Sequence, residues 1–317
     1  MKRFLRRLDQ FWFPEAPAAR LAVLRILVGG FAFCLVAANY TMWGHIGHTS
    51  PALFAPVGVV ALLDHPLAPW LNQGLIVATL VASVFFILGW RYRVTGPAFA
   101  VLLLWTISYR LSWSMIYHSM HLVVLHVLIL GLAPAADALS LDARRATAAA
   151  TARNPAGAWE YGFPIRLICA VTVLAYFVTG MAKAAGPLGS SWVVGEALRS
   201  QVAADAIRKE MLGETGSPLF YLLYHLTWLF TVIGVMSFAL ELGAPFALLN
   251  RRLGQGWAVG AFFMHWGILL IMGINFRYHL SGILYASFFD VEYLAAWLAV
   301  LWTRVANRPV PMRPATS

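Results

Sequence analysis

The sequence predicts an all-α protein, a polytopic transmembrane helical bundle of about eight spans with an interfacial segment at its N-terminus. Of the 317 residues, 61% are apolar and only 11% are charged, whereas about a quarter of the residues of a soluble domain carry charge. Stretches long enough, or nearly so, to cross the hydrocarbon core of a bilayer recur at residues 18–40, 71–90, 94–113, 115–133, 164–185, 219–240, 257–274 and 280–302.

These stretches leave too little sequence for a separate soluble domain, so we expect one transmembrane domain over residues 1–317. Within it we expect a basic, aromatic interfacial segment over 1–17, a flexible cytoplasmic linker over 143–159, and an external loop over 186–218 that carries a surface helix. The last apolar stretch has Asp290 and Glu292 in its middle. Two interpretations therefore stay open: eight full spans, or seven spans and a broken one.

The basic residues indicate the orientation of the chain. The net charge is +10, but the arginines lie between the spans and every second loop is basic. This distribution follows the positive-inside rule and predicts that both termini are cytoplasmic, and it does not predict a nucleic-acid partner. Arg20 and Arg25, in the opening turns of the first span, lie near enough to the surface to snorkel.

The first apolar run is too long for a cleavable signal peptide. We therefore expect an integral protein of a bacterial cytoplasmic membrane, with the lipid bilayer and a lipid-soluble small molecule as its partners.

The two cysteines lie inside apolar stretches without a C-x-x-C pattern, which argues against thiol-relay chemistry.

Lys183 ends an apolar run that breaks at Gly186-Pro187. A lysine placed there is either an interface anchor or a buried amine that works as a base. Snorkelling alone explains a single lysine, but other ionisable residues fall on the same outer side of the membrane in the predicted topology. They are Arg110, His118, His121, His225, Arg277 and His279.

Ionisable groups inside a membrane usually face the bundle interior, so this shared side indicates a polar cavity that opens outward. A lysine among other cations loses its proton more readily, which is the setting that a lysine base needs. Each histidine taken alone is better explained as a structural residue. Their common side is what favours the functional interpretation.

Three blocks of the sequence resemble one known family. The blocks are the pattern Y-x-x-x-G-x-x-K over 176–183 followed by Trp192 and Gly195, the histidine-led stretch from His118 to Asp142, and the stretch from Phe263 to Phe276. They resemble the HTTM domain, which contains the membrane core of vitamin K-dependent gamma-carboxylase. The resemblance implies that Lys183 is the catalytic base, that His118 or His121 is the active-site histidine, and that His265 is a further histidine of the core.

In that family oxygen oxidises a reduced quinone, and the strong base produced removes a proton from a glutamate before carbon dioxide adds. The resemblance therefore implies a lyase with a vitamin K-like hydroquinone as cofactor, and with oxygen and carbon dioxide as co-substrates. We assign substrate binding to Arg110, Trp192, His225 and Arg277.

The chain departs from the animal carboxylase in two respects. It stops soon after the last apolar stretch, so we expect no counterpart of the large soluble region that holds the protein substrate, and residues 184–191 are longer than the carboxylase spacing. A protein substrate is therefore not expected, although it is not excluded. Proton abstraction from a hydroquinone or a similar lipid-soluble acid does not depend on that region.

Two other classes compete with this interpretation. A membrane protein that binds or transports a quinone or an anionic ligand without turnover would use the same cavity, although no internal repeat or pair of broken helices points to a transporter. A metal site formed by His118, His121 and His265 rests on one H-x-x-H pattern, which is a weak signal, so we expect no metal.

Overall fold

The structure, a computed structural model, describes residues 2–113, 115–146, 158–294 and 297. These residues form helices and no β-strand, apart from an isolated backbone bridge between Ala16 and Ala158, which confirms the all-α class. The α-helices are α1 (Lys2–Trp12), α2 (Ala18–Ala38), α3 (Tyr40–His45), α4 (Pro69–Leu88), α5 (Tyr92–Leu111), α6 (His121–Leu132), α7 (Leu141–Ala146), α8 (Trp159–Ala185), α9 (Glu196–Met211), α10 (Pro218–Leu223), α11 (Thr227–Leu242), α12 (Arg251–Met272) and α13 (Arg277–Leu280). Short 3₁₀ helices lie between them: η1 (Ile46–His48), η2 (Pro51–Leu53), η3 (Gly58–Leu62), η4 (His118–Met120), η5 (Gly189–Trp192), η6 (Ala244–Leu248) and η7 (Ile283–Phe288).

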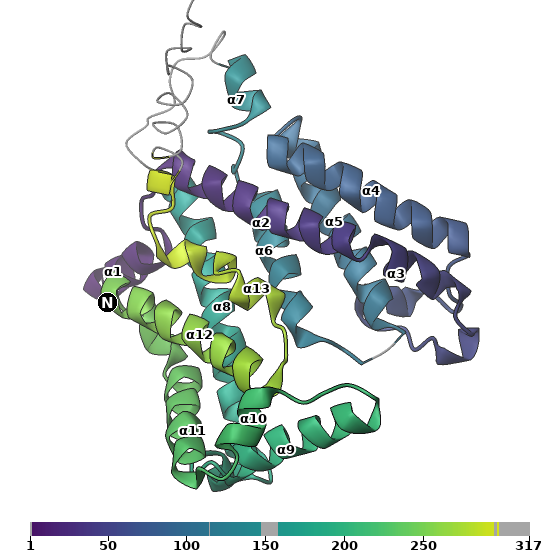
Figure 1. The fold of residues 1–317 in the computed structure, drawn as a ribbon. Coiled ribbons are helices and arrows are strands. Elements are labelled where there is room, and N and C mark those ends of the chain that lie inside the picture. The colour runs from purple at the N-terminus through teal and green to yellow at the C-terminus, as the bar shows by residue number, and fades with distance from the viewer. Residues whose placement is uncertain (1, 114, 147–157, 295–296, 298–317) are drawn as a thin grey trace, which may run out of the picture.

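Among the described residues, five helices are long and apolar enough to cross a membrane: α2, α4, α5, α8 and α12. The apolar helices α6 and α11 are shorter. Together these seven helices correspond to the first seven predicted stretches (Figure 1). The eighth stretch is broken where it is described, because only η7 lies between residues 281 and 290. Of the two interpretations, the described part of the chain therefore favours seven spans and a broken one.

Arg25 joins the ends of several helices, and it is fully buried. Its guanidinium donates to the carbonyl oxygens of Ala135 and Leu139, each at 2.6 Å, and to that of Ile87 at 3.2 Å. The expectation that Arg25 snorkels towards the membrane surface was wrong. Carbonyls at the end of α4 and in the connection from α6 to α7 satisfy the charge inside the protein, and this ties both to α2.

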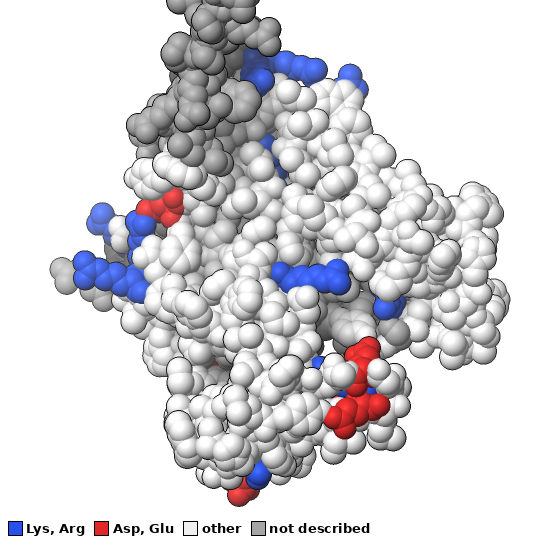
Figure 2. Space-filling view, viewed as in Figure 1, with Lys and Arg blue, Asp and Glu red and all other residues white. Residues whose placement is uncertain are grey.

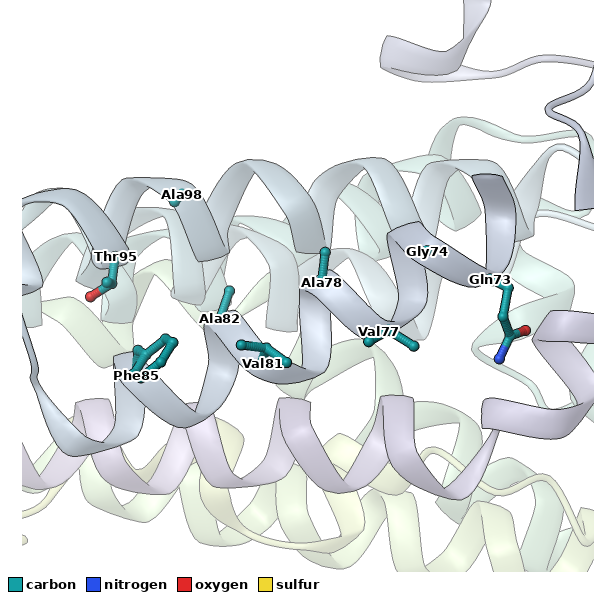
Figure 3. Close-up of a pocket in the computed structure, with 9 residues that line it drawn as sticks. All are labelled: Gln73, Gly74, Val77, Ala78, Val81, Ala82, Phe85, Thr95 and Ala98. Carbon is teal, nitrogen blue, oxygen red and sulfur yellow. The ribbon is translucent and has the colours of Figure 1, made fainter. Parts of the chain in front are cut away.

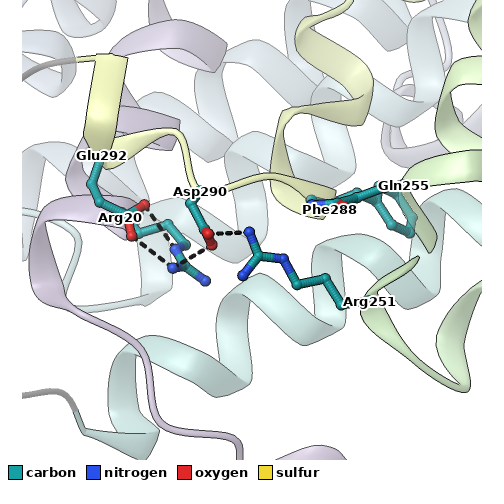
Figure 4. Close-up of polar contacts among 6 residues, drawn as sticks. All are labelled: Arg20, Arg251, Gln255, Phe288, Asp290 and Glu292. Atoms are coloured by element: carbon teal, nitrogen blue, oxygen red, sulfur yellow. Dashed lines mark hydrogen bonds and ion pairs between the residues drawn. The ribbon is translucent and has the colours of Figure 1, made fainter. Parts of the chain in front are cut away.

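A second ionic group lies at the same end of the bundle (Figure 4). The Arg20 guanidinium donates to Glu292 at 2.6 and 2.8 Å and lies 2.5 Å from Asp290. Arg251, at the start of α12, also pairs with Asp290. The two acidic residues of the last apolar stretch thus meet arginines of α2 and α12, which explains why this stretch does not continue as a membrane-spanning helix.

The segments outside the spans agree in part with their predictions. Residues 2–12 of the predicted interfacial segment form α1, and residues 186–218, which the topology predicts to be external, contain a helix, α9. Residues 147–157 of the predicted linker lie outside the described residues. In the space-filling view, uncharged side chains cover most of the visible face, as expected for a surface that faces lipid (Figure 2).

Candidate active site

Helix α8 carries a row of small or polar residues on one face. Cys169, Thr172, Tyr176, Gly180 and Lys183 follow one another at spacings of three or four residues, so they lie along one side of the helix. The first four are buried in the bundle. Lys183 therefore lies at the end of this buried row of small or polar residues.

Lys183 pairs with Glu241 of α11. Its Nζ donates to Oε1 of Glu241 at 2.6 Å, and the side chains are 24% and 6% exposed. The ring of Trp192, in η5, lies 5.2 Å from the same Nζ, close enough for a cation–π contact. The amine is thus neither fully buried nor a free interface anchor. It lies at the edge of the protein with a carboxylate on its inner side.

Gly180 makes this pairing sterically feasible. A Cβ at this position would lie 2.9 Å from Cβ of Glu241 and 3.0 Å from the backbone nitrogen of Leu242. Since real Cβ atoms do not approach so closely, only glycine lets the end of α11 contact α8 here. The glycine of the Y-x-x-x-G-x-x-K pattern therefore positions Glu241 beside the lysine one turn further along.

The second carboxylate oxygen of Glu241 has no hydrogen-bond partner among the described residues, although it is buried. A buried acceptor without a partner costs free energy unless a donor reaches it. The carboxylate can therefore accept a hydrogen bond from an additional group, such as the hydroxyl of a ligand.

About two turns further into the bundle, four aromatic side chains form a compact polar group: Tyr176, His265, His279 and Tyr285. The Tyr176 and Tyr285 hydroxyls lie 2.6 Å apart, and Nδ1 of His265 lies 3.2 Å from the Tyr176 hydroxyl. The rings of His265 and His279 stack at 4.1 Å. Nδ1 of His265 also donates to the carbonyl of Ala261 at 2.9 Å, so that nitrogen carries the proton and Nε2 does not when the ring is neutral.

This aromatic group and the ion pair are neighbours. Tyr176 lies one turn from Gly180 on the same face of α8, Glu241 packs against Gly180, and both side chains are buried. A second buried polar group contacts the row at Thr172. In it, His126 of α6 forms hydrogen bonds to Tyr278 at 2.8 Å and to Thr172 at 3.0 Å. Ionisable groups buried inside a membrane bundle are usually functional, and here they line one helix face.

The structure brings only part of the predicted site together. Trp192 contacts Lys183, and His265 lies in the adjacent group. His121, His225 and Arg277 have exposed side chains, and no contact among the described residues joins them to Lys183. Arg110 lies 6.0 Å from the ring of Tyr117. The side chain of His118 lies outside the described residues, so its role stays a prediction.

One electrostatic expectation was wrong. We expected cations around Lys183, but the charged group against it among the described residues is the carboxylate of Glu241. Glu241, in the last turn of α11, pairs with a lysine that the predicted topology assigns to the outer side. Helix α11 has 16 residues, fewer than the roughly 20 needed to cross the hydrocarbon core, so its last turn does not reach the opposite surface.

Three pockets of the described chain lie elsewhere, at α4 and α5, at α3 and the start of α4, and at α1, and their linings contain no predicted catalytic or substrate-binding residue. Nor do three His, Cys, Asp or Glu side chains come together as metal ligands among the described residues. The candidate site is therefore defined by the ion pair and the aromatic group.

Sequence reasoning missed Glu241 and Tyr285. The sequence did contain a signal for Glu241. It is the one charged residue in the sequence of α11, and an isolated acid inside an apolar helix indicates a buried partner. Tyr285 had none, since it lies in a 3₁₀ helix whose contact with Tyr176 spans 109 positions of the sequence.

The bundle and its buried polar row define an integral membrane protein with an ionisable centre in its interior. The sequence matches the HTTM domain over residues 13–272, a range that contains all seven apolar helices. The chain therefore belongs to the HTTM domain family, a membrane family related to the carboxylase. No curated protein and no solved structure matches the chain.

Proposed function

We propose that this protein is a membrane enzyme in which Lys183 removes a proton from a reduced quinone or a similar lipid-soluble acid. The observation that carries the proposal is the Lys183 and Glu241 pair, 2.6 Å apart, at the end of a buried polar row. A lysine accepts a proton only as the free amine. The carboxylate beside it is a group to which the ammonium can pass its proton.

The surroundings of the pair fit an aromatic hydroxyl compound. The ring of Trp192 offers a flat apolar face beside Nζ of Lys183, and the unsatisfied oxygen of Glu241 can accept a hydrogen bond from a hydroxyl group. A reduced quinone supplies both a flat ring and an acidic hydroxyl. The bound hydroquinone would supply the redox chemistry, while the residues of this chain would orient its ring and take its proton.

The remaining roles follow from the family. His118 or His121 would stabilise the anion, and His265 would support the site through Tyr176, whose hydroxyl lies 3.2 Å from its ring. Arg110, Trp192, His225 and Arg277 are the proposed substrate-binding residues, and Trp192 is the one that contacts Lys183. Oxygen and carbon dioxide are the proposed co-substrates, and carboxylation of a small lipid-soluble acid is the proposed overall reaction class.

The test is oxygen uptake by the purified protein with reduced naphthoquinones and benzoquinones. Lys183→Ala removes the amine, and Lys183→Arg keeps a cation beside Glu241 but does not release a proton near neutral pH. We expect uptake in the unmodified protein and its loss in both variants. Lys209→Ala, which removes another paired lysine, is the control. Equal uptake in all four proteins, or tight quinone binding without turnover in the unmodified protein, would contradict the proposal.

A further inference from the structure

A pocket of about 330 Å³ lies at the junction of α3, η1 and the start of α4. Its lining offers several hydrogen-bond donors and contains no carboxylate. The lining residues are Tyr40, Thr41, Gly44, His45, His48, Pro69, Trp70 and Gln73. Neutral histidine, tyrosine, threonine, tryptophan and glutamine all carry a donor, so the pocket is complementary to a group rich in acceptors.

These donors are not used within the described part of the protein. No side-chain hydrogen bond there involves His45, His48 or Gln73, and the two imidazole rings lie 6.5 Å apart. The pocket is nevertheless held in shape from behind, because the buried amide of Asn72 donates to the carbonyl of Trp43 at 2.9 Å. A fixed wall with free donors is the arrangement of a binding site rather than of a flexible loop.

An apolar groove of about 610 Å³ begins where the pocket ends. Gln73 lines both, and from it the groove follows α4 through Gly74, Ala78 and Ala82 to Phe85, with Ala98 of α5 on its other side (Figure 3). The small residues form its floor, and a Cβ at Gly74 would meet no atom within 4 Å. The exposed side chains of Val77 and Val81 border it.

The dimensions of the groove suit one hydrocarbon chain. From Gln73 to Phe85 a helix advances about 18 Å at 1.5 Å per residue, and one leaflet contributes about 15 Å of a hydrocarbon core that is about 30 Å thick. A chain whose head lies in the pocket would therefore follow α4 through the leaflet on the side of α3.

We propose that the pocket and groove together bind one phospholipid, with its phosphate diester in the pocket and an acyl chain along α4. The donors of the pocket lining, which contains no carboxylate, favour this occupant. A phosphate presents only acceptors to the donors of His45, His48 and Gln73, and hydrogen bonds to a charged acceptor are the stronger kind. The site is separate from Lys183, so it does not depend on the proposed enzymatic function.

Photoactivatable phosphatidylglycerol, in vesicles that otherwise contain phosphatidylcholine, tests the proposal. We expect labelling concentrated on residues 73–85 of the unmodified protein. His45→Ala with His48→Ala removes two donors and should lower it at least about a hundredfold, since the loss of each hydrogen bond to a charged acceptor costs about tenfold or more. Ala78→Trp, which fills the groove from an exposed position, should lower it at least as far.

Matched controls use exposed residues outside the site. His65→Ala removes a nearby imidazole that does not line the pocket, and Leu174→Trp adds a large ring on the exposed face of α8. Both should label like the unmodified protein. Labelling that is equal in all variants, or spread evenly over the exposed helices, would mean ordinary annular lipid and would overturn the proposal. Displacement by a prenylated quinone but not by excess phosphatidylglycerol would overturn the identity of the occupant.

Discussion

Nζ of Lys183 and Oε1 of Glu241 lie 2.6 Å apart, although 58 positions of the sequence separate the two residues. The contact exists because α11 ends against Gly180, one turn before the lysine. The lysine side chain reaches solvent or lipid in part, while the carboxylate is almost fully buried. Once the amine of Lys183 has taken a proton, the buried carboxylate of Glu241 can accept it.

Replacing Glu241 by glutamine should lower turnover sharply. The amide keeps the size and one hydrogen bond to Lys183 but cannot take a proton, and general acid–base groups contribute about 10²–10⁴-fold to a rate. Oxygen uptake with a reduced quinone measures the effect. The control is Glu210→Gln, which changes an exposed acid on α9 and should leave uptake unchanged. Full activity of Glu241→Gln would remove the carboxylate from the mechanism.

Gly180→Ala should weaken both stability and activity. The added methyl group would lie 2.9 Å from Cβ of Glu241, and overpacking of this kind costs about 1–3 kcal/mol. Gly256→Ala is a matched control, since it is also a glycine within a long helix but has no atom within 4 Å of the added carbon. Thermal unfolding in detergent should show a lower midpoint for the first variant and an unchanged or higher one for the second. The reverse order would show that α8 and α11 do not pack as described.

Tyr176→Phe should destabilise the protein by about 1–3 kcal/mol, because the buried hydroxyl of Tyr285 loses its nearest partner, at 2.6 Å, and keeps only the longer contact of 3.4 Å with His265. Tyr176→Phe combined with Tyr285→Phe should be less destabilised than the sum of the single variants, since removing both partners leaves no unsatisfied group. A double-mutant cycle from unfolding midpoints measures the coupling. Simple additivity would show that the two hydroxyls do not interact.

Arg25→Met should lower the unfolding midpoint more than Arg91→Met. The Arg25 guanidinium donates to three carbonyl groups at 3.2 Å or less, and each hydrogen bond from a charged donor is worth about 1.5–3 kcal/mol. Arg91 is exposed at the turn between α4 and α5, where a surface charge contributes little. Similar midpoints for the two variants would support the snorkelling arginine that the sequence predicted.

The fold could be predicted from the sequence because length and apolarity alone decide which segments cross a bilayer. Seven of the predicted stretches contain an apolar helix in the structure. For the eighth stretch the sequence left a full span and a broken one open. The choice depends on contacts that form only on folding, since Asp290 and Glu292 meet Arg20 and Arg251 from other helices.

The site was predictable only in part. The sequence singled out the pattern of Tyr176, Gly180 and Lys183, and in the structure these residues lie along one face of α8. The spacing could not show which residue lies against it. Glu241 contacts the lysine through helix packing, and it reverses the sign of the charge that we had expected there.

The most direct measurement of the central claim is chemical rescue of Lys183→Ala. If Lys183 is the base, small primary amines should enter the space left by its side chain and restore oxygen uptake, with rates that rise with the basicity of the amine. The same amines should leave Glu241→Gln unrescued. Full uptake by Lys183→Ala without added amine, or no restoration at any amine concentration in a variant that still binds quinone, would contradict the assignment of Lys183 as the base.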